Sequence, residues 1–213
     1  MRALVIGASG GIGAAVAAAW AARCEVVGLS RAGDGLDVTD EAAVAAALGR
    51  LSGQFDRVLI ATGALGVPEK SLKVLTAQAM LAQFAVNAVG PALVLKHLLP
   101  LLPRDRAVRV GVLSARVGSI GDNALGGWYS YRAAKAALNQ IVHTAAIELA
   151  RSHPLAVLAA LHPGTVATDF TAGYPGTKDA PAVAADRLIT VLEALSPAQS
   201  GGFYDYAGKA VVW

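Results

Sequence analysis

A short apolar segment that runs directly into a glycine-rich turn opens this chain. Ala3–Ile6 contains only apolar residues, as a buried strand does, and Gly7–Gly13 follows with the sequence Gly-Ala-Ser-Gly-Gly-Ile-Gly. The alanine-rich stretch Ile12–Ala22 is typical of a helix. A buried strand that turns tightly into a helix is the first half of a βαβ unit, so we expect an α/β fold with a parallel sheet.

The rest of the sequence repeats this alternation of short strands and helices. Further strands are predicted at residues 25–29, 57–61, 107–113, 155–161 and 202–206, and helices at 39–48, 71–82, 83–99, 128–150 and 182–195. Thr39 is expected to cap the helix that it begins. Because no linker, repeat or low-complexity stretch interrupts the pattern, residues 1–213 are predicted to form a single Rossmann-type domain, a doubly wound parallel sheet with helices on both faces.

Composition excludes several other classes of protein. Hydrophobic residues make up 55% of the chain and charged residues 15%, which fits strands covered by helices on both sides. The 18 basic residues are scattered and the net charge is +3, so nucleic acid is not an expected partner. No cluster of Cys, His and Asp has ligand spacing, so no metal site is predicted.

The expected location is the cytoplasm. Glycines interrupt the apolar start of the chain, which argues against a signal peptide. Lys96 and His97 interrupt the longest apolar stretch, so no membrane span is predicted. The lone Cys24 fits a reducing compartment.

Tyr131 and Lys135 are four residues apart in the predicted helix 128–150, so their side chains share one face. A lysine at that spacing can lower the pKa of a phenol and leave it ready to give or take a proton. Tyr129 points about 200° away and is interpreted as a packing or pocket residue. Together with a glycine turn that can hold a pyrophosphate, the pair predicts hydride transfer to or from a carbonyl.

Ser30 and Arg31 follow the second predicted strand, where a dinucleotide site distinguishes its cofactors. An acidic residue there binds both ribose hydroxyls, whereas an arginine accommodates a 2′-phosphate. The sequence therefore favours NADP(H), with NAD(H) as the alternative cofactor. A solvated arginine on a turn is the competing interpretation.

These motifs, in this order, resemble the short-chain dehydrogenase/reductase family over essentially the whole chain, in particular its small carbonyl-reductase-like members. The matching positions are Gly7, Gly11 and Gly13, Asp37-Val38, Asn87–Gly90, Gly118–Ile120, Tyr131 with Lys135, and Pro163–Thr168.

The resemblance implies a role for each matching residue. Tyr131 would donate a proton to a carbonyl oxygen, and Lys135 would bind the nicotinamide ribose and lower the pKa of that tyrosine. Asn87 would distort its helix and hold a water that links Lys135 to solvent. The expected substrate is a small carbonyl compound or alcohol. The expected cofactor-binding residues are Gly7, Ser9, Gly10, Gly11, Ile12, Gly13, Ser30, Arg31, Asp37, Val38, Ala61, Thr62, Gly63, Tyr131, Lys135, Pro163, Gly164, Val166 and Thr168.

The position of the family's substrate-binding serine holds Ala115 in this chain. Ser114 lies one residue earlier, and neighbouring strand residues face opposite sides, so Ser114 reaches the substrate only if the strand end bulges or twists. We predict Ser114 as the catalytic serine, with Ser119 as the substitute. If neither serves, the substrate oxygen loses one hydrogen bond and catalysis weakens.

Two further departures concern packing and the substrate lid. Ile60–Gly63 replaces the family's Asn-Asn-Ala-Gly, which affects the sheet more than the chemistry. Only Asp169–Pro181 separates the Pro-Gly motif from the next helix, which predicts a short lid and an open pocket. A catalytically weak NADP(H)-binding regulatory protein therefore remains an alternative to the enzyme.

The apolar content of the helices at 83–99 and 128–150 fits assembly into a homodimer or homotetramer. Helix faces buried in the core of a monomer would be equally apolar, so both interpretations stay open.

Overall fold

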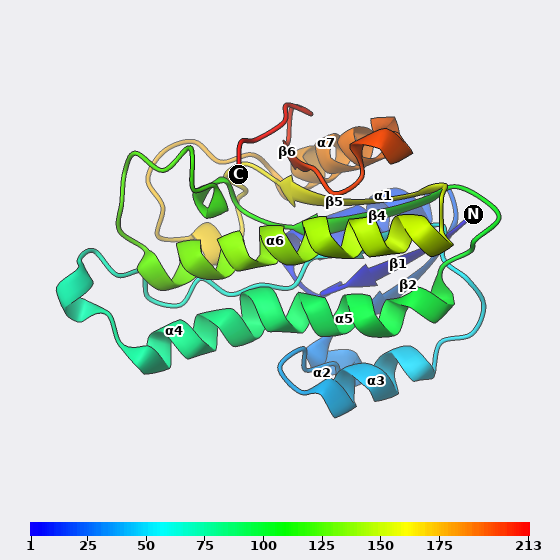
Figure 1. Ribbon diagram of the computed structural model, residues 1–213, viewed down its shortest axis with the longest axis horizontal. Helices are drawn as coiled ribbons and strands as arrows, with labels where there is room; N and C mark the ends of the chain where they lie inside the picture. Colours follow the sequence, from blue (N-terminus) through cyan, green and yellow to red (C-terminus); the bar gives the residue numbers. More distant parts are fainter.

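The computed structural model describes all 213 residues and contains one six-stranded parallel sheet with helices on both faces (Figure 1). The strands are β1 (Arg2–Ile6), β2 (Glu25–Leu29), β3 (Arg57–Ile60), β4 (Val108–Leu113), β5 (Ala156–His162) and β6 (Phe203–Asp205). Their order in the sheet is β2-β1-β3-β4-β5-β6. The predicted Rossmann-type α/β fold is confirmed.

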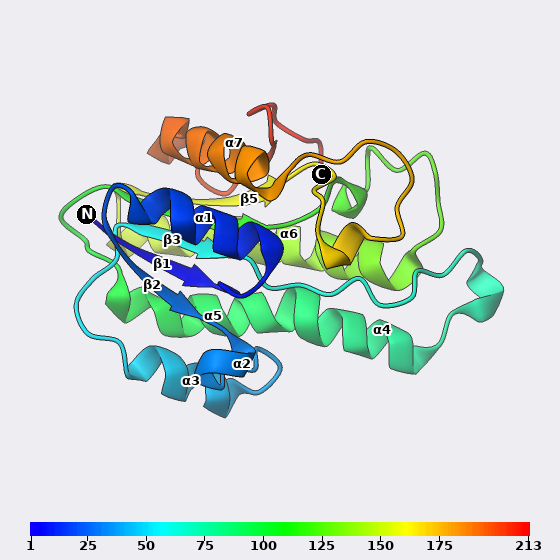
Figure 2. The ribbon, with the colours of Figure 1, turned by 180° about the vertical axis from the view of Figure 1, so that it is seen from behind.

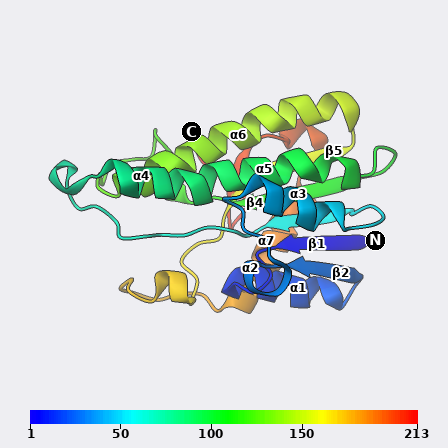
Figure 3. The ribbon, with the colours of Figure 1, turned by 90° about the horizontal axis from the view of Figure 1, so that it is seen from below.

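The helices form one layer on each face of the sheet (Figures 2 and 3). One layer contains α1 (Gly11–Ala21) and α7 (Pro181–Ala194), and the other contains α3 (Glu41–Gly49), α4 (Ala77–Phe84), α5 (Gly90–Leu98) and α6 (Tyr129–Ser152). Because successive side chains of a strand point to opposite faces of the sheet, each strand contributes residues to both hydrophobic layers. On β1, for example, the even-numbered Leu4 and Ile6 pack with the α3, α5 and α6 layer, and the odd-numbered Ala3 and Val5 with α1 and α7.

The direction in which the chain crosses the sheet reverses at β1. The chain leaves β1 for β2 at one edge, and then returns to β3 on the opposite side of β1. The connections after β1 and β3 therefore diverge, which leaves a crevice at the carboxyl ends of these two strands. In Figure 1 the strand arrows point towards the end of the molecule where α6 begins.

Several element boundaries differ from the predictions. Asp40, and not Thr39, caps α3, because its carboxylate accepts the backbone N–H of Ala42 at 2.9 Å. The helices expected at 71–82 and 83–99 form instead one continuous helical stretch from Ala77, with a π-helical segment at Ala85–Val89. A four-residue helix, α2 (Arg31–Asp34), was too short to give a periodic signal.

The helical stretch Ala77–Leu101 also bears on the expectation of no membrane span. It has 25 residues and a mean hydropathy of 1.4 in its most apolar window, enough to cross a membrane by length and composition alone. The core helix of a soluble protein passes the same test. This stretch packs against α6, and a cytoplasmic location stays a prediction.

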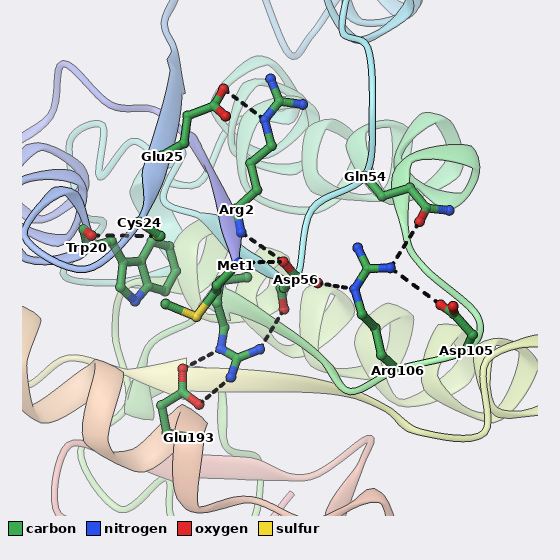
Figure 4. A network of polar contacts seen from close by, with 11 residues as sticks. Met1, Arg2, Trp20, Cys24, Glu25, Gln54, Asp56, Asp105, Arg106 and Glu193 are labelled. Carbon is green, nitrogen blue, oxygen red and sulfur yellow. Dashed lines mark hydrogen bonds and ion pairs between the residues drawn. The ribbon is translucent and has the colours of Figure 1, made fainter.

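A network of ion pairs holds together the amino-terminal ends of the strands (Figure 4). The Asp56 carboxylate accepts the backbone N–H of Arg2 at 2.8 Å and Nε of Arg106 at 2.6 Å. Arg57 of β3 forms a bidentate ion pair with Glu193 of α7, in which two guanidinium nitrogens donate to the two carboxylate oxygens. This network lies at the opposite end of the sheet from the crevice, so its contribution is to stability.

Candidate active site

A cavity of about 730 Å³ lies at the carboxyl ends of the central strands. The predicted residues that line it are Ser9, Gly10, Gly11, Ile12, Gly13, Ala61, Thr62, Gly63, Ser114, Tyr131, Lys135, Pro163, Gly164, Val166 and Thr168. The predicted residues outside its lining are Gly7, Ser30, Arg31, Asp37, Val38 and Asn87. Segments far apart in the sequence thus converge on one cavity.

The glycine-rich turn between β1 and α1 depends on the absence of side chains. Gly7 has a φ of +86°, a conformation that favours glycine, and its N–H donates to Leu29 O at 2.8 Å. A methyl group on Gly13 would collide with the carbonyl oxygen of Gly7. A methyl group on Gly11 would come within 2.5 Å of Cγ2 of Thr168, so the turn packs directly against the Pro163–Thr168 segment.

Tyr131 and Lys135 face the cavity from the first turns of α6. Both are nearly buried, with 5% and 3% exposure, and Nζ of Lys135 lies 5.8 Å from the centroid of the phenol ring. The same Nζ donates a hydrogen bond to Leu113 O at 2.9 Å. The spacing on the helix therefore places the two side chains as expected, whereas Tyr129 does not line the cavity.

The ionisation of this pair differs from the expectation. Burial raises the pKa of the Tyr131 phenol, and Tyr174 adds to that rise. Burial also lowers the pKa of Lys135 to about 7. Desolvation of the phenol sets the direction of this shift, so the lowering of the Tyr131 pKa that was expected from Lys135 is not seen. The phenol is protonated at neutral pH and can donate that proton.

Asn87 lies in the π-helical segment between α4 and α5 and is fully buried. Its amide exchanges two hydrogen bonds with the backbone of Ala64, at 2.8 and 3.1 Å, and donates a third to Oε1 of Gln83 at 2.8 Å. A methyl group on Gly63 would lie 3.1 Å from Oδ1 of Asn87 and 3.7 Å from Nζ of Lys135. Asn87 and Lys135 therefore approach each other around Gly63, and the helix is distorted at Asn87 as expected.

The two candidate serines have different surroundings. Ser114 lines the cavity, but its hydroxyl donates to Oδ1 of Asn139 at 2.6 Å and the side chain is 4% exposed. Ser119 is outside the lining, and its hydroxyl donates to Val212 O. Ala115 also lines the cavity and offers no donor. Ser114 is thus the only one of the two serines that reaches the cavity, and its single proton is already shared with Asn139.

The residues expected to distinguish cofactors surround α2, at the carboxyl end of β2. Ser30 caps this helix by accepting the N–H of Gly33 at 3.0 Å, and its own N–H donates to Asp34 at 2.7 Å. Arg31 is exposed and makes no ion pair. Its guanidinium is free to receive an anion.

Asp37 and Val38 follow α2 and are held by local contacts. Hydrogen bonds from the hydroxyl and the N–H of Thr39 lower the pKa of Asp37. Val38 is buried, and its side chain lies where a methyl group on Gly90 would collide with it. Both residues lie outside the cavity lining, and their expected contact with adenine stays a prediction.

An aromatic cluster around Tyr131 was not predicted. Phe170, in the short lid, has its ring centroid 6.0 Å from that of Tyr131, and the centroid of Trp128 lies 6.3 Å from it. Tyr174 lies 5.5 Å from Trp128, and all four rings line the cavity. From the short lid, Phe170 packs against Tyr131 and Tyr174 packs against Trp128, and the expectation of an open pocket stays a prediction. Trp128 could be suspected from its place beside Tyr131, whereas the lid sequence gave no signal for Phe170 or Tyr174.

His162 also lines the cavity, at the end of β5. Burial lowers the pKa of His162 to about 4, with Arg116 adding to that effect. Its ring is therefore neutral at physiological pH, and its Nδ1 has no hydrogen-bond partner.

A parallel sheet whose strand order reverses beside a glycine-rich turn, with a buried Tyr–Lys pair in the adjoining cavity, defines the class of dinucleotide-binding oxidoreductases. A family model described as enoyl-(acyl carrier protein) reductase matches residues 28–201. This chain belongs to the short-chain dehydrogenase/reductase family, as the resemblance implied. It is an oxidoreductase that acts on a carbonyl group or the corresponding alcohol.

One similar protein is 1-hydroxy-2-glutathionyl-2-methyl-3-butene dehydrogenase of Rhodococcus sp. strain AD45. It is 35% identical over 184 residues, and the alignment covers 84% of this chain and 79% of the relative. C-signal of Myxococcus xanthus is 39% identical over 137 residues, 63% of this chain and 78% of the relative. A short-chain dehydrogenase/reductase of Burkholderia multivorans with bound NADP has a TM-score of 0.85 at 29% identity, covering 100% of this chain and 99% of that one. NADPH-bound carbonyl reductase from chicken fatty liver has a TM-score of 0.87 at 23% identity, covering 100% of this chain and 98% of that one, and shows the shared fold alone.

Proposed function

We propose that this protein reduces a small carbonyl compound with NADP(H), and that Tyr131 donates the proton to the carbonyl oxygen. One observation carries the proposal: Tyr131, Lys135 and the glycine-rich turn line the same cavity. In this proposal residues 1–213 act as one cofactor-binding domain with the catalytic site built into it.

The lining of the cavity fits a nicotinamide dinucleotide. The turn excludes side chains at Gly11 and Gly13, and the buried hydroxyl of Thr62 in the cavity wall has no hydrogen-bond partner in the protein. The first N–H groups of α1 would hold the pyrophosphate. Arg31 would hold the 2′-phosphate of NADP(H), and the bound NADP in the Burkholderia relative supports this preference. A bound nicotinamide would supply or accept the hydride.

The protein's own residues would manage the proton. Tyr131 is protonated at neutral pH, so its phenol can donate to the substrate oxygen. Lys135, with a pKa of about 7, can exchange a proton near physiological pH. A water between Asn87 and Lys135, beside Gly63, would connect the pair to solvent. Ser114, whose proton is shared with Asn139, would contribute little to binding the oxygen.

A second candidate function is a catalytically weak NADP(H)-binding regulatory protein. Ala115 favours it, because this residue removes a donor from the wall of the cavity. The similarity to C-signal, whose name indicates signalling, points the same way. The Tyr–Lys pair favours the enzyme, since binding alone needs no proton donor.

Two measurements in sequence test the proposal. Titration of the protein with NADPH and with NADH, followed by tryptophan fluorescence, is expected to saturate with both and more tightly with NADPH. Turnover of NADPH with a panel of small ketones and aldehydes then separates the enzyme from the regulatory protein. Binding without turnover of any carbonyl would favour the second candidate, and binding of neither nucleotide would contradict both.

A further inference from the structure

The start of α6, which carries Tyr131 and Lys135, has an unusual geometry. Trp128 precedes the helix with a φ of +56°, and it is the only residue other than glycine with a positive φ. No side chain at this position caps the helix, and the first turn contains no acidic residue. A left-handed conformation is unfavourable for tryptophan, and the first N–H groups of a 24-residue helix need acceptors. Another part of the protein must therefore stabilise this start.

Glu69 supplies the missing contacts from the loop after β3. Its carboxylate accepts a hydrogen bond from the hydroxyl of Ser130 and another from the backbone N–H of Ser130 at 3.3 Å. Its backbone oxygen accepts the N–H of Trp128 at 2.6 Å. A negative charge at the amino-terminal end of a helix is also stabilised by the helix dipole.

The burial of Glu69 shows that these contacts are specific. Glu69 is 6% exposed, whereas Val67 in the same loop is 91% exposed, the reverse of their usual preference. A buried carboxylate is costly unless it is fully hydrogen-bonded. Although burial opposes ionisation, the hydrogen bonds from Ser130 hold the pKa of the Glu69 carboxyl below its usual value.

The contacts of Glu69 reach the catalytic pair through adjacent residues. Ser130 directly precedes Tyr131, and the Trp128 ring contacts the rings of Tyr131 and Tyr174. The same loop begins at Ala61–Gly63 in the cavity wall and pairs with Asn87 through Ala64. One loop thus joins the cavity wall to the first turn of α6.

We propose that Glu69 is a positioning residue, which caps α6 and thereby fixes the orientation of Tyr131 and Trp128 in the cavity. The inference rests on the proposed function, because it concerns the placement of the proton donor. Glu69 contacts neither Tyr131 nor the cavity, so its effect acts through Ser130 and Trp128.

The variants Glu69→Ala and Glu69→Gln test this role, with Glu148→Gln as the matched control. Glu148 is an exposed residue of the same helix without an ion pair. For Glu69→Ala we expect kcat to fall at least about tenfold while the Kd for NADPH stays within about twofold, because a misplaced proton donor affects chemistry more than cofactor binding. Glu69→Gln keeps an acceptor for Ser130 and is expected to restore most of kcat. The control is expected to behave as the wild type.

A spectroscopic readout separates this proposal from the proposed function. Comparison of wild-type and Trp128→Phe near-ultraviolet circular dichroism identifies the bands of Trp128, and Glu69→Ala is expected to alter those bands. Unchanged kcat and unchanged Trp128 bands in a folded Glu69→Ala protein would overturn the proposal, even if its melting temperature falls. Absence of wild-type turnover would count against the proposed function, and the Trp128 bands would still decide the role of Glu69.

Discussion

In the proposed function, the side chain at position 115 affects how many hydrogen bonds the substrate oxygen receives. Ala115 offers none, and Ser114 shares its proton with Asn139. Because one well-placed donor to a developing oxyanion is worth a large factor in rate, Ala115→Ser is expected to raise kcat by about tenfold. Ser114→Ala is the matched control and is expected to change kcat by less than about threefold, since it removes a hydroxyl already used by the protein. Steady-state kinetics with one ketone at saturating NADPH measures both. A large loss in Ser114→Ala would instead make Ser114 the functional serine.

A second residue, Arg31, decides the choice of cofactor in this account. It is exposed, has no ion pair, and begins α2, two residues after the end of β2. Arg31→Ala is expected to weaken NADPH binding by about tenfold or more, because a charge-assisted hydrogen bond to the 2′-phosphate is lost, and to leave NADH binding nearly unchanged. Arg23→Ala, at an exposed site after α1, is the control. Fluorescence titration measures each Kd, and an equal loss for both cofactors would reject the 2′-phosphate assignment.

At the level of elements, the network around Asp56 joins the ends of β1 and β3 to the segment before β4 (Figure 4). Asp56→Ala is expected to lower the free energy of unfolding by about 1–3 kcal/mol, because it leaves the N–H of Arg2 and the guanidinium of Arg106 without their acceptor. Activity at 25 °C should be retained, since the network lies far from the cavity. Chemical denaturation at pH 7 measures the loss, with Asp105→Ala as the exposed control.

The same network predicts a pH dependence. Although burial opposes ionisation, the hydrogen bond from Arg106 and the N–H of Arg2 lower the pKa of Asp56 below its usual value. The stability that Asp56 contributes is therefore present above about pH 4 and is lost as the pH falls through its lowered pKa in the folded protein. The difference in unfolding free energy between wild type and Asp56→Ala should shrink towards pH 2. A constant difference would show that the charge of Asp56 contributes nothing.

Strands and helices were largely predictable because the hydrophobic pattern that defines them is local. All six strands were found to within one residue at each end, since most of them are short apolar runs buried between two helix layers. The resemblance implied a distortion of the helix at Asn87, but the hydrophobic pattern gave no sign of the π-helical segment at Ala85–Val89, because this segment depends on the contacts of Asn87 with Ala64 and Gln83. The Asp40 cap was missed because Thr39 and Asp40 are both good capping residues. In the structure the hydroxyl of Thr39 donates to Asp37 instead, and Asp40 caps the helix.

At the level of the whole molecule, the sequence predicted that the glycine turn and the Tyr–Lys pair share one site. It did not predict the aromatic residues that line the rest of the cavity. The residues that line the cavity follow strands in a fixed order, so the parallel topology alone assembles them. Phe170 and Tyr174 were not foreseen, because a 3-10 turn at Asp169–Thr171 and the following loop have no periodic pattern. The pKa of Tyr131 was predicted in the wrong direction, because spacing on a helix says nothing of how deeply the side chain is buried.

In the proposed function the Tyr131 phenol donates the proton in carbonyl reduction, and the variant Tyr131→Phe removes that proton donor. Phenylalanine keeps the ring contacts with Trp128 and Phe170 and removes only the hydroxyl. Single-turnover oxidation of bound NADPH by a ketone should fall by at least about a hundredfold, the size of a general-acid contribution, while the Kd for NADPH stays within about twofold. Tyr129→Phe, outside the cavity, should behave as the wild type. Turnover by Tyr131→Phe at the wild-type rate would show that the proton comes from another group, and Tyr131 would then not be the general acid.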